Sequence, residues 1–376
     1  MRIRLKYIFI LIAAVIATAG AGTAFLAKSY SEEVQLVRSL KPVELAGMDS
    51  LIQLVPMDGA ENRFVAEGEE DGRLFYALTD RDGSCLAEAG QYDYIDFQGD
   101  NDRYLFQQGE YFGYLNQDGQ PVIPARYKEG SPFVEGWAVV WDEKQDCIID
   151  TKGKTCYRAK PNQRLTMLQD GYFLMENGYQ LWVGSVTNRE TLFYSKKGMS
   201  FDSYSEGFFW FSQDRDDGEI RLLCYNADFQ QVFSDKTIQR TSGFSDGRCF
   251  IETGEGEKQC IDEKGNTVFQ LKRDWLTGTS QFSQGLAWIN DGKNNNWFCV
   301  NTRGDRVFSL SGTYSDCGAF QDGYALVIDD DYDNLKKGLA DNRGKLVLPV
   351  CFDSVSWTKG RAAVVGYEGK LYFADF

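Results

Sequence analysis

The side chains best suited to chemistry in this chain of 376 residues are carboxylates, since it has 55 Asp and Glu and no His. Two carboxylates that flank a glycosidic bond can hydrolyse it. The candidate groups are Glu69, Glu70 and Asp71, then Glu255 and Glu257, then Asp329 to Asp331. Such groups are expected in a chain with this many acids. We therefore predict no catalytic residues and no enzyme, and keep a glycan hydrolase as the alternative.

Two loops carry enough acids to suggest oxygen ligands for Ca²⁺. They contain Asp214, Asp216 and Asp217, and Asp329, Asp330, Asp331 and Asp333. Neither loop follows the spaced Asp-x-Asp/Asn-x-Asp/Asn-Gly pattern of a calcium-binding loop. We predict solvated hairpin tips, with no metal site and no cofactor.

The absence of histidine removes several reaction classes. Ser-His-Asp and Cys-His nucleophile pairs, His-ligated metals and imidazole acid–base catalysis all need this residue. The sequence also has no Gly-x-x-x-x-Gly-Lys-Ser/Thr loop and no Gly-x-Gly-x-x-Gly turn at the start of a helix. Nucleotide binding is therefore not indicated.

The nine cysteines include no Cys-x-x-Cys pair, so zinc-ribbon and thioredoxin-type sites are not indicated. Cys147 and Cys156 flank one expected hairpin turn, and Cys249 and Cys260 flank another. A two-residue loop would place either pair within reach of a disulfide, whereas a three-residue loop would separate them. Small buried apolar side chains are the favoured interpretation.

Aromatic residues offer a second kind of site, because a sugar ring stacks on an exposed indole. Trp137, Trp210 and Trp288 are expected in strands whose residues alternate between core and surface. Packing between neighbouring repeats is favoured, with stacking on a carbohydrate as the alternative. Lys196-Lys197 and Lys336-Lys337 are predicted to be isolated charges in turns.

The elements that must position these residues repeat along the chain. A turn of the form Asp/Asn-x-x-Gly recurs about every 37 residues, since 261 residues separate Gly83 from Gly344 in seven steps. The copies begin at Asp80, Asn116, Asp150, Asp262, Asn301 and Asp341, with Ser195 in the same slot and a degraded copy from Asn226 to Phe229. In such a turn Asp or Asn accepts backbone N–H bonds, and Gly adopts a positive φ.

A second signature alternates with the first. An aromatic residue, two polar residues and a Gly precede each apolar strand, as in Phe133 to Gly136. The further copies begin at Tyr204, Phe244, Phe282, Phe320 and Trp357, and a variant begins at Leu168. Two signatures in fixed alternation indicate short strands joined by tight turns, which is an antiparallel meander.

These residues resemble the WG-repeat family, which is named for a Gly that often neighbours an aromatic residue. The copy from Gly113 to Val140 is most similar, with Val-Ile-Pro before Tyr127, and Asp341 to Val365 is next. The resemblance covers roughly residues 62–376 and weakens at Phe229 and within residues 165–195, where we expect function first. It implies a β-rich bacterial repeat that usually has no assigned activity.

The expected fold is all-β, with about eight antiparallel meanders of about 37 residues. They form a β-propeller-like ring, or alternatively an open β-solenoid or superhelix. We predict three segments: a signal peptide or signal anchor at 1–30, a stem or linker at 31–61, and the WG-repeat domain at 62–376. Residues 43–55 of the stem are a candidate for one or two strands.

The first thirty residues differ from the rest. Arg2, Arg4 and Lys6 precede residues 7–27, which carry no charge. This segment is long enough for a transmembrane helix and also has the form of a signal peptide. We predict that the rest is exported, either as a single-pass cell-membrane protein with a cytoplasmic N-terminus or as a secreted protein.

The exported part is strongly acidic. Residues 31–376 hold 36 basic and 55 acidic side chains, a formal charge of −19. Nucleic acid is not expected as a partner, because its phosphates need Lys and Arg. The predicted function is a non-catalytic binding scaffold at the cell envelope for a protein or a neutral glycan. A glycan hydrolase and a structural spacer are the alternatives. The sequence identifies no ligand-binding residue.

Overall fold

The computed structural model describes residues 35–45, 50–178, 180–188, 191–195, 198–214, 218, 220–234, 237–271, 278–292, 296–329, 331, 333–357 and 362–376. The helix predicted at residues 7–27 and the pair Lys196-Lys197 lie outside these described residues. Within them, one helical turn covers residues 35–39, and no helix is long and apolar enough to span a bilayer.

The predicted all-β class is confirmed, because the chain forms antiparallel sheets that follow one another in sequence. The first sheet contains β2–β5, at Leu51–Pro56, Arg63–Glu70, Arg73–Asp80 and Cys85–Ala87. The second contains β6–β9, at Tyr94–Asp100, Arg103–Gln108, Tyr111–Leu115 and Pro121–Tyr127. The third contains β10–β13, at Glu129–Gly130, Trp137–Trp141, Asp146–Asp150 and Thr155–Arg158. The fourth contains β14–β17, at Arg164–Met167, Tyr172–Asn177, Gln180–Ser185 and Thr191–Tyr194.

An eight-stranded sheet follows, and it holds two units of the repeat joined by the pair Leu222↔Ile238. Its first unit is β18–β21, at Met199–Ser205, Phe208–Asp214, Ile220–Tyr225 and Gln231–Val232. Its second is β22–β25, at Ile238–Thr241, Arg248–Thr253, Lys258–Asp262 and Thr267–Gln270. Next come β26–β28, at Leu286–Asn290, Trp297–Asn301 and Arg306–Ser309, and β29–β32, at Tyr314–Cys317, Tyr324–Asp329, Lys337–Asp341 and Leu346–Phe352. The last sheet contains β33–β35, at Ser354–Trp357, Ala362–Tyr367 and Lys370–Asp375, together with β1 at Lys41–Pro42.

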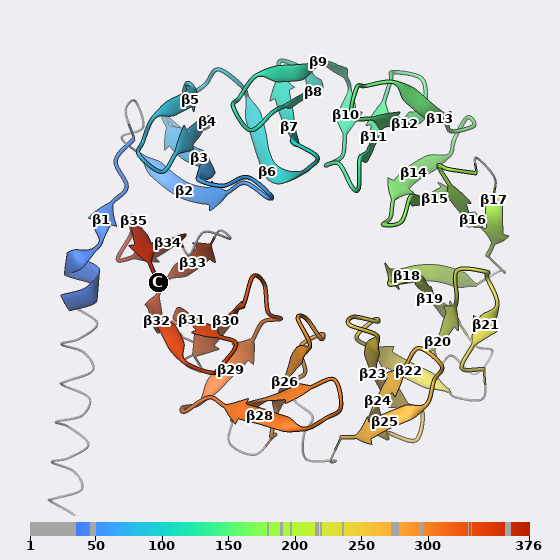
Figure 1. The fold of residues 1–376 in the computed structure, drawn as a ribbon. Helices are drawn as coiled ribbons and strands as arrows, with labels where there is room; N and C mark the ends of the chain where they lie inside the picture. Colours follow the sequence, from blue (N-terminus) through green and yellow to red (C-terminus); the bar gives the residue numbers. More distant parts are fainter. Residues whose placement is uncertain are drawn as a thin grey trace, which may run out of the picture.

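The sheets follow one another around a circle, with the first strand of each near the middle and its last strand near the rim (Figure 1). Side chains on successive residues of a strand point to opposite faces. In β3, Val65 packs toward the second sheet, whereas Phe64 and Ala66 pack on the opposite face. The middle strands are therefore buried on both faces, which explains their continuous apolar sequences.

The Asp/Asn-x-x-Gly segments form the predicted turns. In each described copy, one side-chain oxygen of the Asp or Asn accepts the N–H groups of the residues two and four positions later, at 2.8–3.1 Å. The fourth-position Gly of the copies that begin with Asp or Asn adopts φ of 75–85°. Phe229 replaces this Gly in the degraded copy and adopts φ 56°, so Asn226 preserves the turn without it.

The aromatic-x-x-Gly signature forms a second turn that also links neighbouring sheets. Its last two residues both have positive φ, for example 48° at Glu135 and 86° at Gly136, as a type I′ turn requires. The third-position side chain accepts backbone N–H bonds from the same turn of the next unit of the repeat. These bonds of 2.6–2.9 Å run from Asp170 to Glu135, from Asp246 and Gly247 to Glu206, from Gly285 to Asp246, and from Gly323 to Gln284. These side chains thus stabilise contacts between neighbouring units of the repeat.

The first and last sheets contact each other. The ring centroids of Phe64 in β3 and Phe373 in β35 lie 5.4 Å apart, and both rings pack with Leu54 and Val364. Phe64 has no exposed surface. The interface between the first and last sheets is therefore an apolar core, like those between sheets that are consecutive in the sequence.

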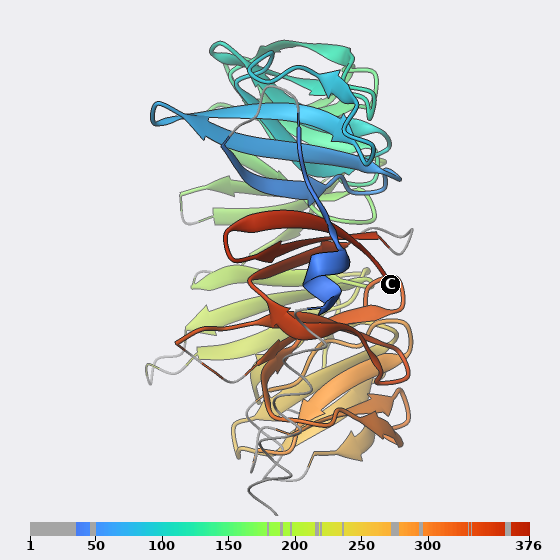
Figure 2. The same ribbon diagram turned by 90° about the vertical axis from the view of Figure 1, so that its left-hand side faces the viewer.

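The segment that precedes the first sheet also contacts the last one. β1 pairs with β35 through Lys41↔Phe373, and the N–H of Val43 donates to the carbonyl of Leu371 at 2.9 Å. Figure 2 shows this segment crossing from the first sheet to the last. Residues 31–61, predicted as a stem or linker, contain β1 and β2, and both strands are paired in sheets.

Candidate functional site

The acidic groups named for glycan hydrolysis lie in hairpins of separate sheets. Glu69, Glu70 and Asp71 are at the β3–β4 hairpin, and Glu255 and Glu257 are at the β23–β24 hairpin. Of the third group, Asp329 ends β30 and Asp331 lies in the connection to β31, whereas Asp330 lies outside the described residues. The topology thus distributes these carboxylates over three sheets.

Two of the described candidate calcium ligands accept hydrogen bonds from backbone N–H groups of their own loop. Asp329 accepts the N–H of Lys336 at 3.0 Å, and Asp331 accepts the N–H of Asp333 at 3.2 Å. Asp214 ends β19, whereas Asp216, Asp217 and Asp330 lie outside the described residues. In the part of the chain that the structure describes, no group of three or more His, Cys, Asp or Glu side chains is arranged to hold a metal ion.

The three tryptophans named for carbohydrate stacking pack between neighbouring units of the repeat. Trp210 and Trp288 have no exposed surface, and Trp288 stacks on Phe320 with ring centroids 5.3 Å apart. Trp137 is partly buried and packs against the core between the third and fourth sheets. Trp210 and Trp288 therefore present no surface to a ligand.

The two cysteine pairs are separated by their register. Cys249 lies opposite Ile261, and Cys260 lies opposite Phe250, so the two thiols point to opposite faces of their sheet. Cys147 lies opposite Arg158. Neither pair is joined by a disulfide, and the thiols of Cys147, Cys249 and Cys260 are buried. The disulfide alternative is therefore wrong for both pairs.

A cleft between the third and fourth sheets brings together polar groups that the sequence did not reveal. Its volume is about 340 Å³, within the roughly 300–1,000 Å³ range of small-molecule sites. We name it the Trp141 cleft, after the tryptophan that ends β11. Glu129, Trp141 and Asp146 line it from the third sheet, and Arg164 lines it from the fourth.

The strand register explains why the third-sheet residues meet. Glu129 in β10 lies opposite Trp141 in β11, and Trp141 lies opposite Asp146 in β12. Residues directly opposite in antiparallel strands share one face of the sheet. The three side chains therefore form a row across the sheet that faces β14.

Arg164 completes the row from the neighbouring sheet. Its Nη2 lies 2.6 Å from Oε2 of Glu129, and its Nε lies 3.1 Å from Oδ2 of Asp146. Its guanidinium carbon also lies 5.6 Å from the centre of the Trp141 ring, within cation–π range. One guanidinium thus holds two carboxylates and an indole at the edge of the cleft.

Asp146 is the buried member of this group. Its side chain is only 1% exposed, and Oδ2 also accepts the backbone N–H of Leu165 at 2.8 Å. Burial raises the pKa of this carboxyl, and the charge of Glu129 raises it further, while the Leu165 N–H and Arg164 oppose the shift. Glu129 and Arg164 remain more than half exposed. A ligand in the cleft would therefore meet the exposed carboxylate of Glu129, whereas the buried carboxylate of Asp146 holds Arg164.

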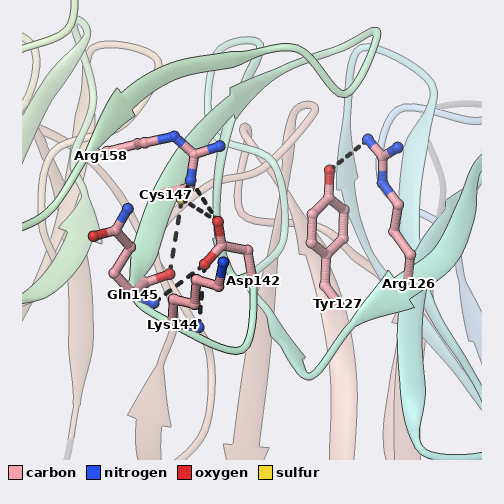
Figure 3. A network of polar contacts seen from close by, with 7 residues as sticks. All are labelled: Arg126, Tyr127, Asp142, Lys144, Gln145, Cys147 and Arg158. Carbon is pink, nitrogen blue, oxygen red and sulfur yellow. Dashed lines mark hydrogen bonds and ion pairs between the residues drawn. The ribbon is translucent and has the colours of Figure 1, made fainter.

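A second polar network lies on the other face of the same hairpin (Figure 3). Asp142 accepts the backbone N–H of Lys144 and of Gln145, which closes the turn between β11 and β12. Its other oxygen pairs with Arg158 and accepts the Cys147 thiol at 3.4 Å.

Burial alone would raise the pKa of Asp142, but its bonds from Arg158, from the backbone and from Cys147 outweigh burial and lower it. Burial raises the pKa of Cys147 to about 12, and the neighbouring Asp142 adds to the shift. The thiol is therefore not a reactive nucleophile at neutral pH. This network fixes the hairpin that presents Trp141 and Asp146.

The strands that lead into this hairpin match a known family. Residues 112–140, from β8 to β11, match the WG containing repeat. The chain therefore carries a WG repeat. The match confirms the resemblance that the sequence predicted, and it shows that the WG unit spans two sheets, since β8 and β9 belong to the second sheet and β10 and β11 to the third.

No curated protein sequence matches the chain. Among solved structures, the chain is similar to the computationally designed Ika8 protein, with 12% identity, a TM-score of 0.44, and coverage of 90% of this chain and 100% of that one. It is also similar to BamB from Moraxella catarrhalis, with 9% identity, a TM-score of 0.39, and coverage of 77% and 97%. Dipeptidyl peptidase 4 from Porphyromonas gingivalis gives 11% identity, a TM-score of 0.47, and coverage of 87% and 58%.

Proposed function

We propose that this protein is an exported, non-catalytic WG-repeat scaffold whose sheets close into a propeller-like ring and display a ligand-binding surface at the cell envelope. The chain begins with basic residues, continues with the uncharged segment 7–27 and then becomes strongly acidic. This order supports export, either as a single-pass membrane protein or as a secreted protein. The apolar contact of Phe64 and Phe373 between the first and last sheets supports closure. An open solenoid would leave both end sheets exposed.

The observation that carries the binding role is the Trp141 cleft. It is concave and preformed, and it combines an aromatic wall with groups that donate and accept hydrogen bonds, as small-molecule sites do. By contrast, the acids of the aromatic-x-x-Gly turns, such as Glu135 and Glu206, are bound to backbone N–H groups of the next unit of the repeat. Those acids hold the scaffold together and have a structural role.

A glycan hydrolase is the second candidate, and one feature of the cleft favours it. Glu129 and Asp146 contact the same guanidinium in a concave site, and burial raises the pKa of Asp146, as a proton donor requires. Arg164 argues against it, because it bonds to both carboxylates and stabilises both in the charged form. Binding without turnover is therefore the better-supported function.

Two measurements on the purified full-length protein test this function. A glycan array together with a pull-down from envelope extract should identify a glycan or a protein that binds reproducibly. Incubation with the bound glycan should release no new reducing ends. Release that disappears in Asp146→Asn would establish the hydrolase instead. A protein that retains neither glycan nor protein would be a structural spacer, and the binding proposal would be wrong.

A further inference from the structure

We propose that the Trp141 cleft binds a neutral saccharide, with Glu129, Trp141 and Arg164 as its recognition surface and the buried Asp146 holding Arg164 in place. This inference rests on the proposed binding role and adds the class of ligand and its location. It excludes charged glycans and basic proteins as occupants of this cleft, although the charge of the whole chain would attract cations.

The charges in the cleft select against ionic ligands. Glu129 and Asp146 supply two negative charges, and Arg164 supplies one positive charge between them. At the mouth of the cleft, an ammonium group would meet the Arg164 guanidinium, and a carboxylate or phosphate would meet the Glu129 carboxylate. Because Glu129 and Arg164 pair with each other and Asp146 is buried, a ligand gains most by hydrogen bonding to both exposed partners without carrying a charge of its own.

The hydrogen-bonding groups match a polyhydroxyl ligand. A carboxylate accepts O–H bonds and a guanidinium donates N–H bonds, whereas a hydroxyl both donates and accepts. Glu129 and Arg164, which are 57% and 59% exposed, present an acceptor beside a donor at the mouth of the cleft. One hydroxyl of a sugar ring can donate to Glu129 while its neighbour accepts from Arg164. Hydrogen bonds to charged partners such as these are stronger than bonds between neutral groups.

The remaining walls match the apolar side of a sugar. Trp141 is partly exposed, and the cleft is also lined by Pro132, Val134, Leu165 and Met167. The C–H groups on one face of a pyranose ring pack on such aromatic and apolar surfaces. Figure 1 shows β10 and β14, the strands that border the cleft, on the inner side of the circle of sheets.

The test uses the full-length protein and neutral tetrasaccharides of glucose, mannose and N-acetylglucosamine as probes, with glucosamine and galacturonate tetramers as charged comparisons. We expect calorimetry to detect at least one neutral probe and neither charged probe. We expect the affinity for the neutral probe to change little between about 0.05 and 0.5 M salt, because the ligand carries no charge to screen.

Matched variants locate the site. Glu129→Gln should weaken binding about tenfold or more, because it replaces a charged acceptor. Glu143→Gln makes the same change on the adjacent hairpin tip, outside the cleft, and should leave affinity unchanged. Trp141→Ala should abolish binding and Trp141→Phe should retain part of it, whereas Tyr194→Ala, which removes an aromatic side chain 66% exposed on the fourth sheet, should have no effect.

The outcomes separate this inference from the proposed function. Neutral-glycan binding that survives both Glu129→Gln and Trp141→Ala would overturn the assignment to this cleft and leave the scaffold function intact. Binding of a charged glycan alone, lost in Trp141→Ala, would overturn the neutral class. Binding only to an envelope protein would overturn the inference but support the scaffold. Circular dichroism of each variant shows that its fold is retained.

Discussion

Closure of the ring predicts that a core residue between the first and last sheets contributes as much stability as its counterpart between two consecutive sheets. Phe64 and Phe173 are matched for this purpose. Each is the second residue of the second strand in its sheet, each faces the preceding sheet, and each has no exposed surface. For Phe64, the preceding sheet is the last one, where the ring of Phe373 lies 5.4 Å away. For Phe173, it is the third sheet, where Val139 and Ile148 belong to the same core.

Phe64→Ala should therefore lower the free energy of unfolding by about 3–5 kcal/mol, the usual cost of removing a fully buried Phe side chain. Phe173→Ala should lower it by a similar amount. In an open solenoid, Phe64 would lie on an exposed end sheet, and its replacement would cost under about 1 kcal/mol. Urea unfolding followed by circular dichroism gives both values. A large loss in Phe173→Ala beside a negligible loss in Phe64→Ala would refute closure.

Three further predictions follow from single residues. Asn301→Ala removes the acceptor of two backbone N–H bonds in a turn and should cost about 1–2 kcal/mol in urea unfolding; a wild-type midpoint would contradict the role of this turn. Asp146 has a raised pKa in the folded state, so the stability it contributes is present below its unfolded pKa and is lost as pH rises through its folded pKa. The free energy of unfolding of the wild type, relative to that of Asp146→Asn, should thus fall as pH rises from about 3.5 to 7. A difference that stays constant with pH would disprove the raised pKa of Asp146. In the native protein, a thiol reagent at pH 8 should label the exposed Cys85 and spare Cys147, which is 1% exposed, as peptide mass spectrometry would show; equal labelling would contradict the burial of Cys147.

The repeat could be predicted because its turns are local. Asp or Asn at one position and Gly three residues later determine a tight turn by their own hydrogen bonds and backbone freedom. The same reasoning marked Asn226 to Phe229 as degraded, yet the structure preserves the turn there. Phe229 adopts the positive φ that Gly would provide, and its ring stacks on Phe193 with centroids 5.3 Å apart. Packing thus compensates for a strained backbone.

The Trp141 cleft was missed because it depends on contacts that no local pattern records. The spacing of Trp141 and Asp146 across a four-residue turn was a usable signal, since it places them opposite each other once the register is known. The sequence holds no such signal for the contact of Arg164 with these residues, because that contact depends on how the fourth sheet packs against the third. The sequence did indicate residues 165–195 as irregular, and β14, which borders the cleft, lies at the start of that stretch.

Similar limits apply to the ends of the chain. Residues 31–61 have no repeat signature, so the sequence predicts a stem there, with residues 43–55 as a candidate for one or two strands. β1 adds to the last sheet by backbone pairing with β35, and such pairing needs no particular side chain. A strand of two residues therefore gives almost no sequence signal, even where it contacts the sheet at the opposite end of the chain.

The most direct test of the account is a crystal structure of the protein grown with the neutral tetrasaccharide that binds most tightly. We predict a sugar ring in the Trp141 cleft, with hydroxyls hydrogen-bonded to Glu129 and Arg164 and an intact glycosidic bond. A saccharide bound at another surface, with the Glu129–Arg164–Asp146 group undisturbed and the cleft empty, would contradict it.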